Sequence, residues 1–559
     1  MTYLDKYSEW LNHPVLTEAE KKELKQIEHN DTEIRERFTQ DLEFGTAGLR
    51  GVLGMGTNRM NRYIVRRTTQ GFAQYIKSMG EEACRRGIVI AHDNRRFSVE
   101  FSRETAGVLA ANGIKAYLFD ALRPTPELSF AVRELKAFGG VMITASHNPP
   151  EYNGYKLYDE RGCQLVPEIN DLVVAQIETV PNALSVSALS MEEAGDLIEV
   201  LGEDMDEAYY RNMMAISLKK GDAKGSVKIV YSPQHGTGNV PVRTVLGRLG
   251  YHVIPVEEQC TPDKDFSKTL NPNPETAEAY VLALEYAEKN DADIVITTDP
   301  DCDRLGVAVK HKGEYVRMTG NQSAAVLLEY ILSQRAAQGT LPKNGVMFNT
   351  IVTSDLGDRI CEKYGVSVEK TLTGFKFIGD KIYRHETAGD KTFVFGYEES
   401  YGCLISDCVR DKDAVQASLM LCEAAEFYKD KGMTLIDALN ELFAEHGFFQ
   451  DALDNFTFKG LDGGDKIKAL VDGLRNDPPT KAGDVAVTKL EDYTSKEMLD
   501  LGFPKSNVLR FILADGSWVA VRPSGTEPKC KFYFSVVADT YDDAMVKLKD
   551  MRAVFEKDC

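Results

Sequence analysis

Several signals that would place a chain in a specialised class are missing from this sequence of 559 residues. None of its ten cysteines forms a C-x-x-C pair, and no Cys/His cluster has the spacing of a zinc site. The most apolar stretch, residues 323–332, is too short to cross a bilayer and contains Glu329. Residues 1–13 are polar and charged, so no apolar leader is expected. We therefore expect reduced thiols, a cytoplasmic location and no membrane partner.

Basic residues are also in deficit. The chain has 66 Lys and Arg residues against 86 Asp and Glu residues, a formal net charge of −20. No nucleic-acid partner is expected, because binding a phosphate backbone needs a basic face. A small anionic substrate stays compatible with this charge, provided that cations concentrate at one site. Hydrophobic residues make up 43% of the chain and charged residues 27%, which is typical of globular domains with sizeable cores.

One pattern recurs along the chain: a short apolar run ends in a cluster of polar, turn-forming residues. The runs are residues 140–145, 227–231, 294–298, 392–395 and 518–521. Continuous apolar runs of this length predict strands buried on both faces. Helical periodicity lies between them, as in residues 275–289, where Ala277, Tyr280, Leu284 and Ala287 share one predicted face. The alternation predicts an α/β fold with largely parallel sheets, in which ligands bind beyond the carboxyl ends of the strands.

Length and shifts in composition divide the chain. At about 150 residues per domain, 559 residues predict three or four domains. Breaks are expected after the acidic, helical stretch 191–213, near 310–320 and around 445–465. The predicted domains are residues 1–205, 206–316, 317–445 and 446–559. Strand-like segments followed by a closing helix at 542–557 predict that the last domain is α+β.

Three aspartates directly follow the apolar run 294–298. Asp299, Asp301 and Asp303 stand at alternate positions, so in an extended loop their carboxylates point the same way. Such carboxylates repel one another unless a cation lies between them, and oxygen ligands suit Mg²⁺. A solvated acidic turn is the alternative, but it does not explain why the cluster follows a buried strand and ends in Arg304. We therefore predict a metal site at these aspartates.

A second polar cluster, Thr-Ala-Ser-His-Asn-Pro, occupies residues 144–149. It is not the G-x-S-x-G elbow of hydrolases, so an acyl-transfer triad has little support. Ser146 either caps the next element or is a nucleophile; the metal loop favours the nucleophile, because a divalent cation neutralises a phosphate. We predict that the Ser146 oxygen and the three acids share one divalent ion. Lys156 could transfer protons or be a surface lysine, and His147 could orient the serine or be an ordinary loop histidine.

Two further clusters have the composition of phosphate or sugar sites. Residues 522–529 combine an arginine, hydroxyl residues and a glycine, which together let side chains and backbone N–H groups hold a phosphate. A tight Pro/Gly turn is the alternative, and the Walker sequence is absent from the chain. In residues 396–400, Glu398 and Ser400 could bind sugar hydroxyls, but an acidic helix cap explains them equally well. No glycine-rich stretch has the spacing of a dinucleotide-binding loop.

Taken together and in this order, the four clusters resemble those of the α-D-phosphohexomutases, over nearly the whole chain. Residues 144–149 resemble the phosphoserine loop of that family, 299–304 its metal loop, 396–400 its sugar loop and 522–526 its phosphate loop. Length and the Tyr-Glu-Glu-Ser form look most like the bacterial phosphoglucomutase branch, which is related to phosphopentomutases. The resemblance implies four domains around a central cleft: three related α/β domains with mixed, mostly parallel sheets and a smaller C-terminal α+β domain.

The resemblance also implies roles by motif position. Ser146 would carry the phosphoryl group, and Asp299, Asp301 and Asp303 would bind Mg²⁺ with it. The residues beside the transferred group would be Lys156 (a general acid/base), Arg304, His147 and Arg50. The substrate would be held by Thr373, Gly374, Lys376, Glu398, Ser400, Arg522, Ser524, Gly525, Thr526 and Lys529.

The implied activity is that of a phosphoglucomutase, which interconverts glucose 1-phosphate and glucose 6-phosphate through a phosphoserine enzyme and a bisphosphate. Glucose 1,6-bisphosphate would be the activator, and the enzyme a monomer or weak homo-oligomer. A phosphopentomutase or phosphomannomutase with the same mechanism is the alternative, followed by a metal-dependent sugar phosphatase and a silent sugar-phosphate binding protein. The phosphomannomutase/phosphoglucomutase branch follows its sugar motif with glycine and histidine, whereas Tyr401-Gly-Cys403 stands here, which leaves the preferred sugar open.

Overall fold

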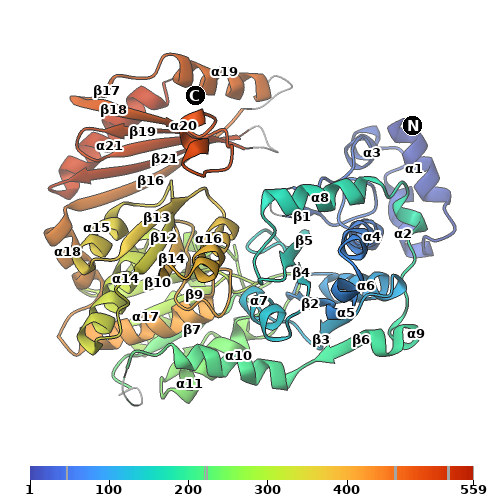
Figure 1. The fold of residues 1–559 in the computed structure, drawn as a ribbon, viewed down its shortest axis with the longest axis horizontal. Coiled ribbons are helices and arrows are strands. Elements are labelled where there is room, and N and C mark those ends of the chain that lie inside the picture. Colours follow the sequence, from blue (N-terminus) through green and yellow to red (C-terminus); the bar gives the residue numbers. More distant parts are fainter. Residues whose placement is uncertain (46–47, 220, 222–224, 459–462, 525–528, 558) are drawn as a thin grey trace.

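The computed structural model describes residues 1–559 except 46–47, 220, 222–224, 459–462, 525–528 and 558. Within these residues, four sheets each come from one continuous part of the chain. Figure 1 shows the first sheet (blue and teal) at the right of the view and the last (orange and red) at the upper left, with the second and third below the last. The fold has the predicted class: three α/β domains followed by an α+β domain.

The first sheet has the strand order β1-β5-β4-β2-β3-β6. Its strands are β1 (Leu49–Val52), β2 (Ile88–His92), β3 (Ala116–Phe119), β4 (Gly139–Ile143), β5 (Tyr152–Asp159) and β6 (Ile198–Leu201). The four strands β4-β2-β3-β6 are parallel to one another. β5 pairs antiparallel with β4, and β1 pairs antiparallel with β5. The helices are α1 (Tyr3–Asn12), α2 (Glu18–Gln26), α3 (Asp31–Phe38), α4 (Arg62–Ser78), α5 (Glu81–Arg86), α6 (Ser98–Ala111), α7 (Thr125–Glu134) and α8 (Pro167–Glu178).

The second sheet, β11-β10-β9-β7-β8, repeats this plan. Its strands are β7 (Ile229–Ser232), β8 (Val253–Pro255), β9 (Ile294–Thr298), β10 (Leu305–His311) and β11 (Glu314–Met318). β7, β8 and β9 are parallel, and β10 and β11 are antiparallel additions. The helices are α10 (Glu203–Ala215), α11 (Asn239–Arg248), α12 (Glu257–Cys260) and α13 (Val281–Asn290).

The third sheet, β13-β12-β14-β15, is a shorter version of the same plan. Its strands are β12 (Gly345–Thr350), β13 (Ser367–Thr371), β14 (Thr392–Glu398) and β15 (Gly402–Leu404). Only β15 is antiparallel. The helices are α14 (Gly320–Gln338), α15 (Leu356–Tyr364), α16 (Phe375–Ala388), α17 (Ala414–Lys429) and α18 (Leu435–His446).

In all three domains, one loop leaves a parallel strand and returns as an antiparallel neighbour. The three loops join β4 to β5, β9 to β10 and β14 to β15. The first two contain the serine cluster and the aspartate cluster, and the sugar cluster spans the end of β14 and the start of the third loop. Because each loop lies at the carboxyl end of a parallel strand, each is placed where ligands bind in sheets of this kind.

The fourth sheet is wholly antiparallel, with the order β16-β21-β20-β19-β18-β17. Its strands are β16 (Phe448–Thr457), β17 (Lys481–Ala482), β18 (Val485–Asp492), β19 (Leu509–Leu513), β20 (Trp518–Pro523) and β21 (Lys529–Ala538). Its helices are α19 (Gly463–Asn476), α20 (Lys496–Asp500) and α21 (Tyr541–Phe555). The polar cluster after the run 518–521 therefore follows a strand whose neighbours are both antiparallel, whereas the other three clusters follow strands that also have a parallel neighbour.

Apolar packing holds the domains against one another. One buried cluster extends through the first three domains to the start of the fourth, from Val89 on β2 to Phe449 on β16. A smaller cluster joins Ile351 and Leu372 of the third domain to Trp518 and Tyr533 of the fourth. Burial of apolar side chains contributes about 25 cal/mol per Å², so these shared clusters stabilise the arrangement of the site loops as well as each domain.

Two helical predictions need correction. The acidic stretch 191–213 is not helical throughout, because β6 lies between α9 (Met191–Ala194) and α10. The segment 275–289 begins with a 3₁₀ turn, Ala277–Tyr280, before α13. With three residues per turn, this start shifts the buried face to Ala279, Tyr280, Ala283 and Ala287.

No helix in the described part of the chain combines the length and apolar composition needed to span a membrane.

Gly71 on α4 should not tolerate a side chain. A Cβ at this position would lie 2.5 Å from Ile177 Cα on α8, so Gly71→Ala forces the two helices apart. We expect a loss of about 1–3 kcal/mol in the free energy of unfolding, measured by urea denaturation. Gly247→Ala on α11, where no atom lies within 4 Å, is the matched control and should stabilise by about 0.5–1 kcal/mol. Equal stabilisation by both changes would contradict this packing.

Candidate active site

Ser146 lies in the loop from β4 to β5, with its side chain buried. Its φ angle is +51°, in the left-handed region, which costs a non-glycine residue about 1–2 kcal/mol. Its N–H donates to Thr144 Oγ1 at 2.8 Å, and its hydroxyl donates to Asp299 Oδ2 at 2.7 Å. His147 Nδ1 lies 3.2 Å from the same hydroxyl. The strained backbone thus aims the hydroxyl at an aspartate 153 positions away in the sequence.

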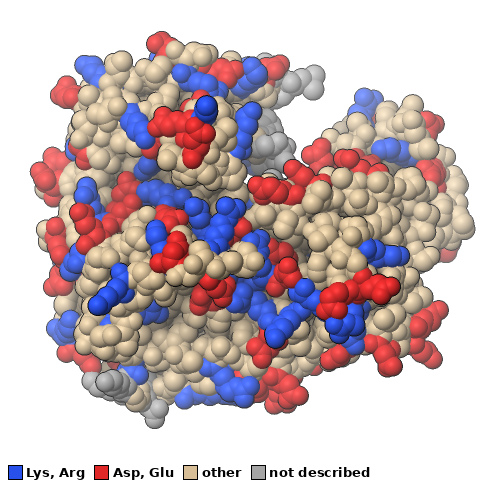
Figure 2. All heavy atoms as spheres, viewed as in Figure 1, with Lys and Arg blue, Asp and Glu red and all other residues tan. Residues whose placement is uncertain are grey.

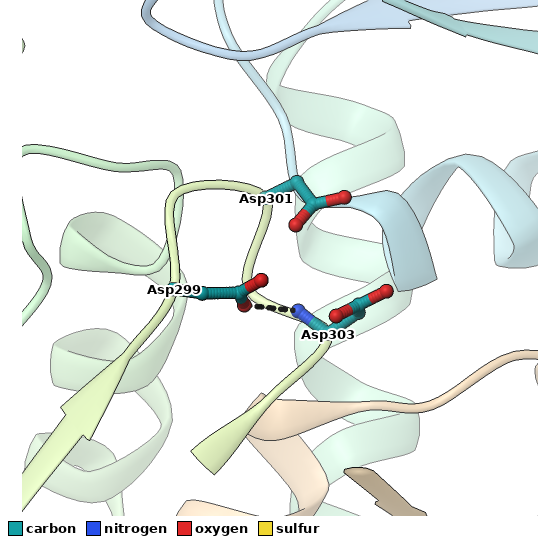
Figure 3. Close-up of side chains that lie close together, drawn as sticks. All are labelled: Asp299, Asp301 and Asp303. Atoms are coloured by element: carbon teal, nitrogen blue, oxygen red, sulfur yellow. Dashed lines mark hydrogen bonds between the residues drawn. The ribbon is translucent and has the colours of Figure 1, made fainter. Parts of the chain in front are cut away.

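Figure 3 shows Asp299, Asp301 and Asp303 on the β9–β10 loop, with their carboxylates around one small volume. All three are buried, and one oxygen of each lies within 4.8 Å of the others. Asp299 Oδ1 accepts the N–H groups of Asp303 (3.1 Å) and Arg304 (3.0 Å). Oδ1 of Asp301 and Oδ1 of Asp303 have no hydrogen-bond partner among the described residues. Buried oxygens without partners are costly and hard cations prefer such ligands, so the donor set fits Mg²⁺.

Two ammonium groups partly balance the acidic loop. Lys156 on β5 donates to Asp301 Oδ2 at 2.8 Å, and Lys412 Nζ lies 3.0 Å from Asp303 Oδ2. Burial raises the pKa of Asp299 well above its usual range, and the charges of Asp301 and Asp303 raise it further. Burial also acts to raise the pKa of Asp301, but the charge of Lys156 and hydrogen bonds with Asp299, Lys156 and Thr125 together lower it. The Arg304 guanidinium adds a third positive group, with its Nε 3.9 Å from Asp303 Oδ1. The raised pKa of Asp299 reflects burial and also repulsion among the three carboxylates, which a cation between them would relieve.

The other predicted catalytic residues border the serine. Burial, with the positive charges of Arg304 and Arg50, lowers the pKa of His147 well below its usual range. The imidazole is therefore neutral at neutral pH and adds no charge beside the Ser146 hydroxyl. Arg50 Nη1 donates to Asn148 Oδ1 in the serine loop at 2.9 Å, and Arg304 Nη1 donates to Glu275 Oε1 at 2.5 Å.

Arg95, which no sequence motif singled out, holds the serine loop in place. Its buried guanidinium donates to four backbone carbonyl oxygens, those of Ser146 (2.6 Å), Pro149 (2.7 Å), Tyr152 (3.1 Å) and Asn148. Asp93 Oδ2 lies 3.2 Å from Arg95 Nε, and both side chains are inaccessible to solvent. A signal was present, because Asp93 and Arg95 follow the apolar strand β2 just as the other clusters follow theirs.

Two more residues reach the acidic loop from other domains. Thr125, the first residue of α7, donates its N–H to the backbone carbonyl of Asp301 and its hydroxyl to Asp301 Oδ2, each at 2.9 Å. An element of the first domain thus orients a carboxylate of the second. Lys412, from the segment before α17, reaches Asp303 in the same way. Neither residue lies in a recognisable motif, since nothing in the local sequence identifies its partner.

The predicted substrate residues lie on the third and fourth domains. Glu398 is buried and accepts the N–H of Gly374 at 2.7 Å, which joins the sugar loop to the neighbouring segment 373–376. Ser400 is half-buried beside it. Thr373, Lys376 and Arg522 line one cavity.

The predicted phosphate loop is described only at its two ends. The N–H of Ser524 donates to the carbonyl of Lys529 at 2.8 Å, which closes the loop between β20 and β21. Gly525 and Thr526 lie outside the described residues.

Comparison with known proteins identifies the family to which this four-domain fold belongs. Four successive models match: phosphoglucomutase/phosphomannomutase alpha/beta/alpha domain I at residues 41–183, domain II at 207–313, domain III at 319–446 and the C-terminal domain at 472–547. The chain belongs to the phosphoglucomutase/phosphomannomutase family and is an enzyme of the phosphohexomutase type.

Individual relatives are similar to this chain over nearly its whole length. The chain is 38% identical over 540 residues to a phosphoglucomutase of Staphylococcus epidermidis, covering 94% of this chain and 97% of the relative. It is 36% identical over 534 residues to a phosphoglucomutase of Staphylococcus aureus, covering 94% and 95%. Among solved structures, a putative phosphomannomutase of Thermus thermophilus matches with a TM-score of 0.68 at 25% identity, covering 92% and 99%. The Paramecium phosphoglucomutase parafusin matches with a TM-score of 0.71 at 19% identity, covering 92% and 95%, which supports the fold alone.

Mg²⁺ should stabilise the folded protein, because it offsets repulsion among three buried carboxylates. At 100 times its dissociation constant, a ligand of the folded state contributes about 2.7 kcal/mol. We expect a rise of a few degrees in Tm with MgCl₂ relative to EDTA, measured by differential scanning calorimetry. Asp303→Asn should lose most of this rise, whereas Asp500→Asn, an exposed acid on α20, should keep it. The same Tm with MgCl₂ and with EDTA would rule the site out.

Arg95→Lys should loosen the serine loop. Lysine keeps the charge beside Asp93 but cannot reach four carbonyl oxygens, so we expect a loss of about 2–4 kcal/mol in unfolding free energy. The amides of residues 146–148 and 151–152 should exchange with deuterium faster than in the unmodified protein. Arg96→Lys, an exposed neighbour paired with Asp265, should change stability by less than about 0.5 kcal/mol. Similar exchange in both variants would contradict the role of Arg95.

Proposed function

We propose that this enzyme interconverts glucose 1-phosphate and glucose 6-phosphate through a phosphoserine at Ser146. One observation carries the proposal: the buried Ser146 hydroxyl donates to Asp299 at 2.7 Å, at the edge of an acidic loop with the donor set of a divalent-cation site. A serine hydroxyl receives and returns a phosphoryl group efficiently only where its charge is offset, and this loop is such a place. Relatives at 36–38% identity that are named phosphoglucomutases support glucose as the sugar.

The metal ligands would be the Ser146 oxygen, Asp299, Asp301 and Asp303, which we propose hold Mg²⁺. When bound, this ion supplies positive charge next to the oxygens of the phosphoryl group. Arg304 and Arg50 would add donors on the same side of the serine. The Arg50 guanidinium is held by Asn148 and the Arg304 guanidinium by Glu275, which reduces the reorganisation needed during the reaction.

In the transfer step, the bond from phosphorus to Ser146 Oγ breaks, and a bond forms from phosphorus to the free hydroxyl of the sugar phosphate. The proton of that hydroxyl passes to the serine oxygen by way of Lys156, the general acid/base in this proposal. The neutral His147 would orient the serine oxygen. The product is a sugar bisphosphate, which returns its other phosphate to Ser146 by the same step in reverse. Glucose 1,6-bisphosphate would therefore restore the phosphoserine and act as the activator.

In this scheme, one group of residues binds the sugar hydroxyls and another binds the phosphate that does not react. Glu398 and Ser400 would bind sugar hydroxyls, with Thr373, Gly374 and Lys376 beside them. The phosphate that is not reacting would be held by Arg522, Ser524, Gly525, Thr526 and Lys529. Because the bisphosphate must bind in both orientations, this grip has to recognise phosphate whichever carbon carries it.

Several further features belong to the proposal. The phosphoserine, metal, sugar and phosphate functions would belong to residues 1–205, 206–316, 317–445 and 446–559, respectively. A cytoplasmic location and a monomer or weak homo-oligomer are proposed with them, and the described cysteines form no disulfide.

Ser146→Ala should abolish the mutase reaction. We expect turnover of glucose 1-phosphate to fall by about a thousandfold or more, because the phosphoryl acceptor is gone. After incubation with glucose 1,6-bisphosphate, intact mass spectrometry should find one added phosphoryl group on the unmodified protein and none on the variant. Ser78→Ala, an exposed serine of α4, should behave like the unmodified protein. Full turnover by Ser146→Ala would refute the phosphoserine.

The alternatives differ in what they release and which sugar they accept. A phosphatase using the same aspartates would release inorganic phosphate, whereas a mutase conserves it, so paired assays for glucose 6-phosphate and phosphate separate the two. Comparing glucose, mannose and ribose 1-phosphates in one assay decides between phosphoglucomutase, phosphomannomutase and phosphopentomutase.

A further inference from the structure

A cavity of about 160 Å³ lies where residues of the first, third and fourth domains meet. Its polar lining consists of Thr373, Lys376, Lys505, Ser506 and Arg522. Three of these residues belong to the proposed substrate grip. Lys505 and Ser506 do not, since they come from the segment between α20 and β19.

The cavity has an unusual charge for this protein. Lys376, Lys505 and Arg522 line it, whereas no Asp or Glu among the described residues does, although acids outnumber bases by 86 to 66 in the chain. Figure 2 shows Lys and Arg side chains gathered near the centre of the view, between the C-terminal domain and the first domain. A concave site with three cations and no acid attracts an anion.

Lys505 has no partner in the described part of the chain, whereas several lysines of the C-terminal domain are paired with acids. Lys468, Lys489 and Lys547 pair with Asp472, Glu491 and Asp515, respectively. In the part of the chain that the structure describes, the Lys505 ammonium makes no ion pair and no hydrogen bond. Its charge is therefore available to a ligand in the cavity.

The backbone around Lys505 is firmly held. Tyr493 donates its N–H to the Val508 carbonyl at 3.0 Å and accepts the Ser506 N–H at 3.0 Å. Its ring meets Phe503 edge to face, with centroids 5.1 Å apart. A loop fixed on both sides of Lys505 loses little conformational freedom when a ligand binds, which favours affinity.

The size of the cavity limits the ligand. At about 30 Å³ per water, the 160 Å³ hold about five waters, which is well below the several hundred Å³ of pockets for drug-sized molecules. A single phosphate group with some of its water fits this space, and a nucleotide does not.

We propose that Lys505 and Ser506 bind the non-reacting phosphate of the sugar phosphate, together with Arg522 and Lys376. This inference rests on the proposed function and extends its substrate grip by a second segment of the C-terminal domain. Lys505 supplies a positive charge and Ser506 supplies a hydroxyl. Both come from the segment between α20 and β19, which lines the cavity together with Arg522 of the phosphate loop. Because that phosphate is present before, during and after transfer, the contact contributes equally to ground-state and transition-state binding.

Lys505→Gln tests the charge. We expect KM for glucose 1-phosphate to rise about tenfold and kcat to stay within about twofold, as for loss of uniform binding. Inhibition by inorganic phosphate should weaken by a similar factor. Lys505→Arg should keep most of the affinity, and Lys549→Gln, an exposed lysine of α21, should match the unmodified enzyme. An active Lys505→Gln enzyme with unchanged KM and unchanged phosphate inhibition would overturn the proposal.

A direct titration separates this inference from the proposed function. Inorganic phosphate is titrated into the unmodified protein and the Lys505→Gln variant by calorimetry, which requires no turnover. Weaker binding by the variant supports the role of Lys505 even if glucose 1-phosphate is not the substrate, and equal binding overturns it. If the unmodified enzyme binds phosphate but does not convert glucose 1-phosphate, the proposed function fails and the phosphate site remains.

Discussion

The burial of three carboxylates on one short loop is the constraint on which the rest of the site depends. Asp299, Asp301 and Asp303 repel one another, and two of their oxygens have no partner among the described residues. Such an arrangement persists only because surrounding elements hold it: the backbone N–H groups after Asp299, the hydroxyl of Thr125, and the ammonium groups of Lys156 and Lys412. The loop is thereby kept ready for a divalent cation.

The three α/β domains position their polar loops in the same way. Each contributes one loop that leaves a parallel strand and returns as an antiparallel neighbour, so its polar residues stand at the carboxyl end of the sheet. The shared apolar cluster brings these loops to a common centre. Contacts between domains then complete the chemistry, because Thr125 and Lys156 of the first domain touch the acidic loop of the second. The site is therefore a property of the assembled domains.

The serine loop shows how strain and support are combined. Ser146 has a left-handed backbone that its side chain does not favour, and Arg95 binds four carbonyl oxygens of the same loop. The hydrogen bonds of a fully buried guanidinium offset that strain. Domain packing contributes too, since the Arg95 guanidinium lies 5.0 Å from the centroid of the Phe266 ring in the second domain. The position of Ser146 is thus fixed from both domains.

Local sequence was sufficient for much of this protein. Apolar runs identified β4, β7, β9, β14 and β20, and the polar residues after them identified the serine, aspartate and sugar loops, because strand burial and turn chemistry depend on neighbours in the chain. The family resemblance came from the order of those clusters. The residue roles drawn from it remain proposals, as do the domain boundaries drawn from length and composition. The 3₁₀ turn before α13 was missed, since a small change of helical pitch leaves no clear mark in the sequence. The sequence led us to expect Ser146 beside the aspartates. Only the tertiary structure decided that its hydroxyl meets Asp299 Oδ2, and that Arg95, Thr125 and Lys412 lie at the site. Partners so far apart in sequence are chosen by the packing of whole domains, which no short stretch of residues encodes.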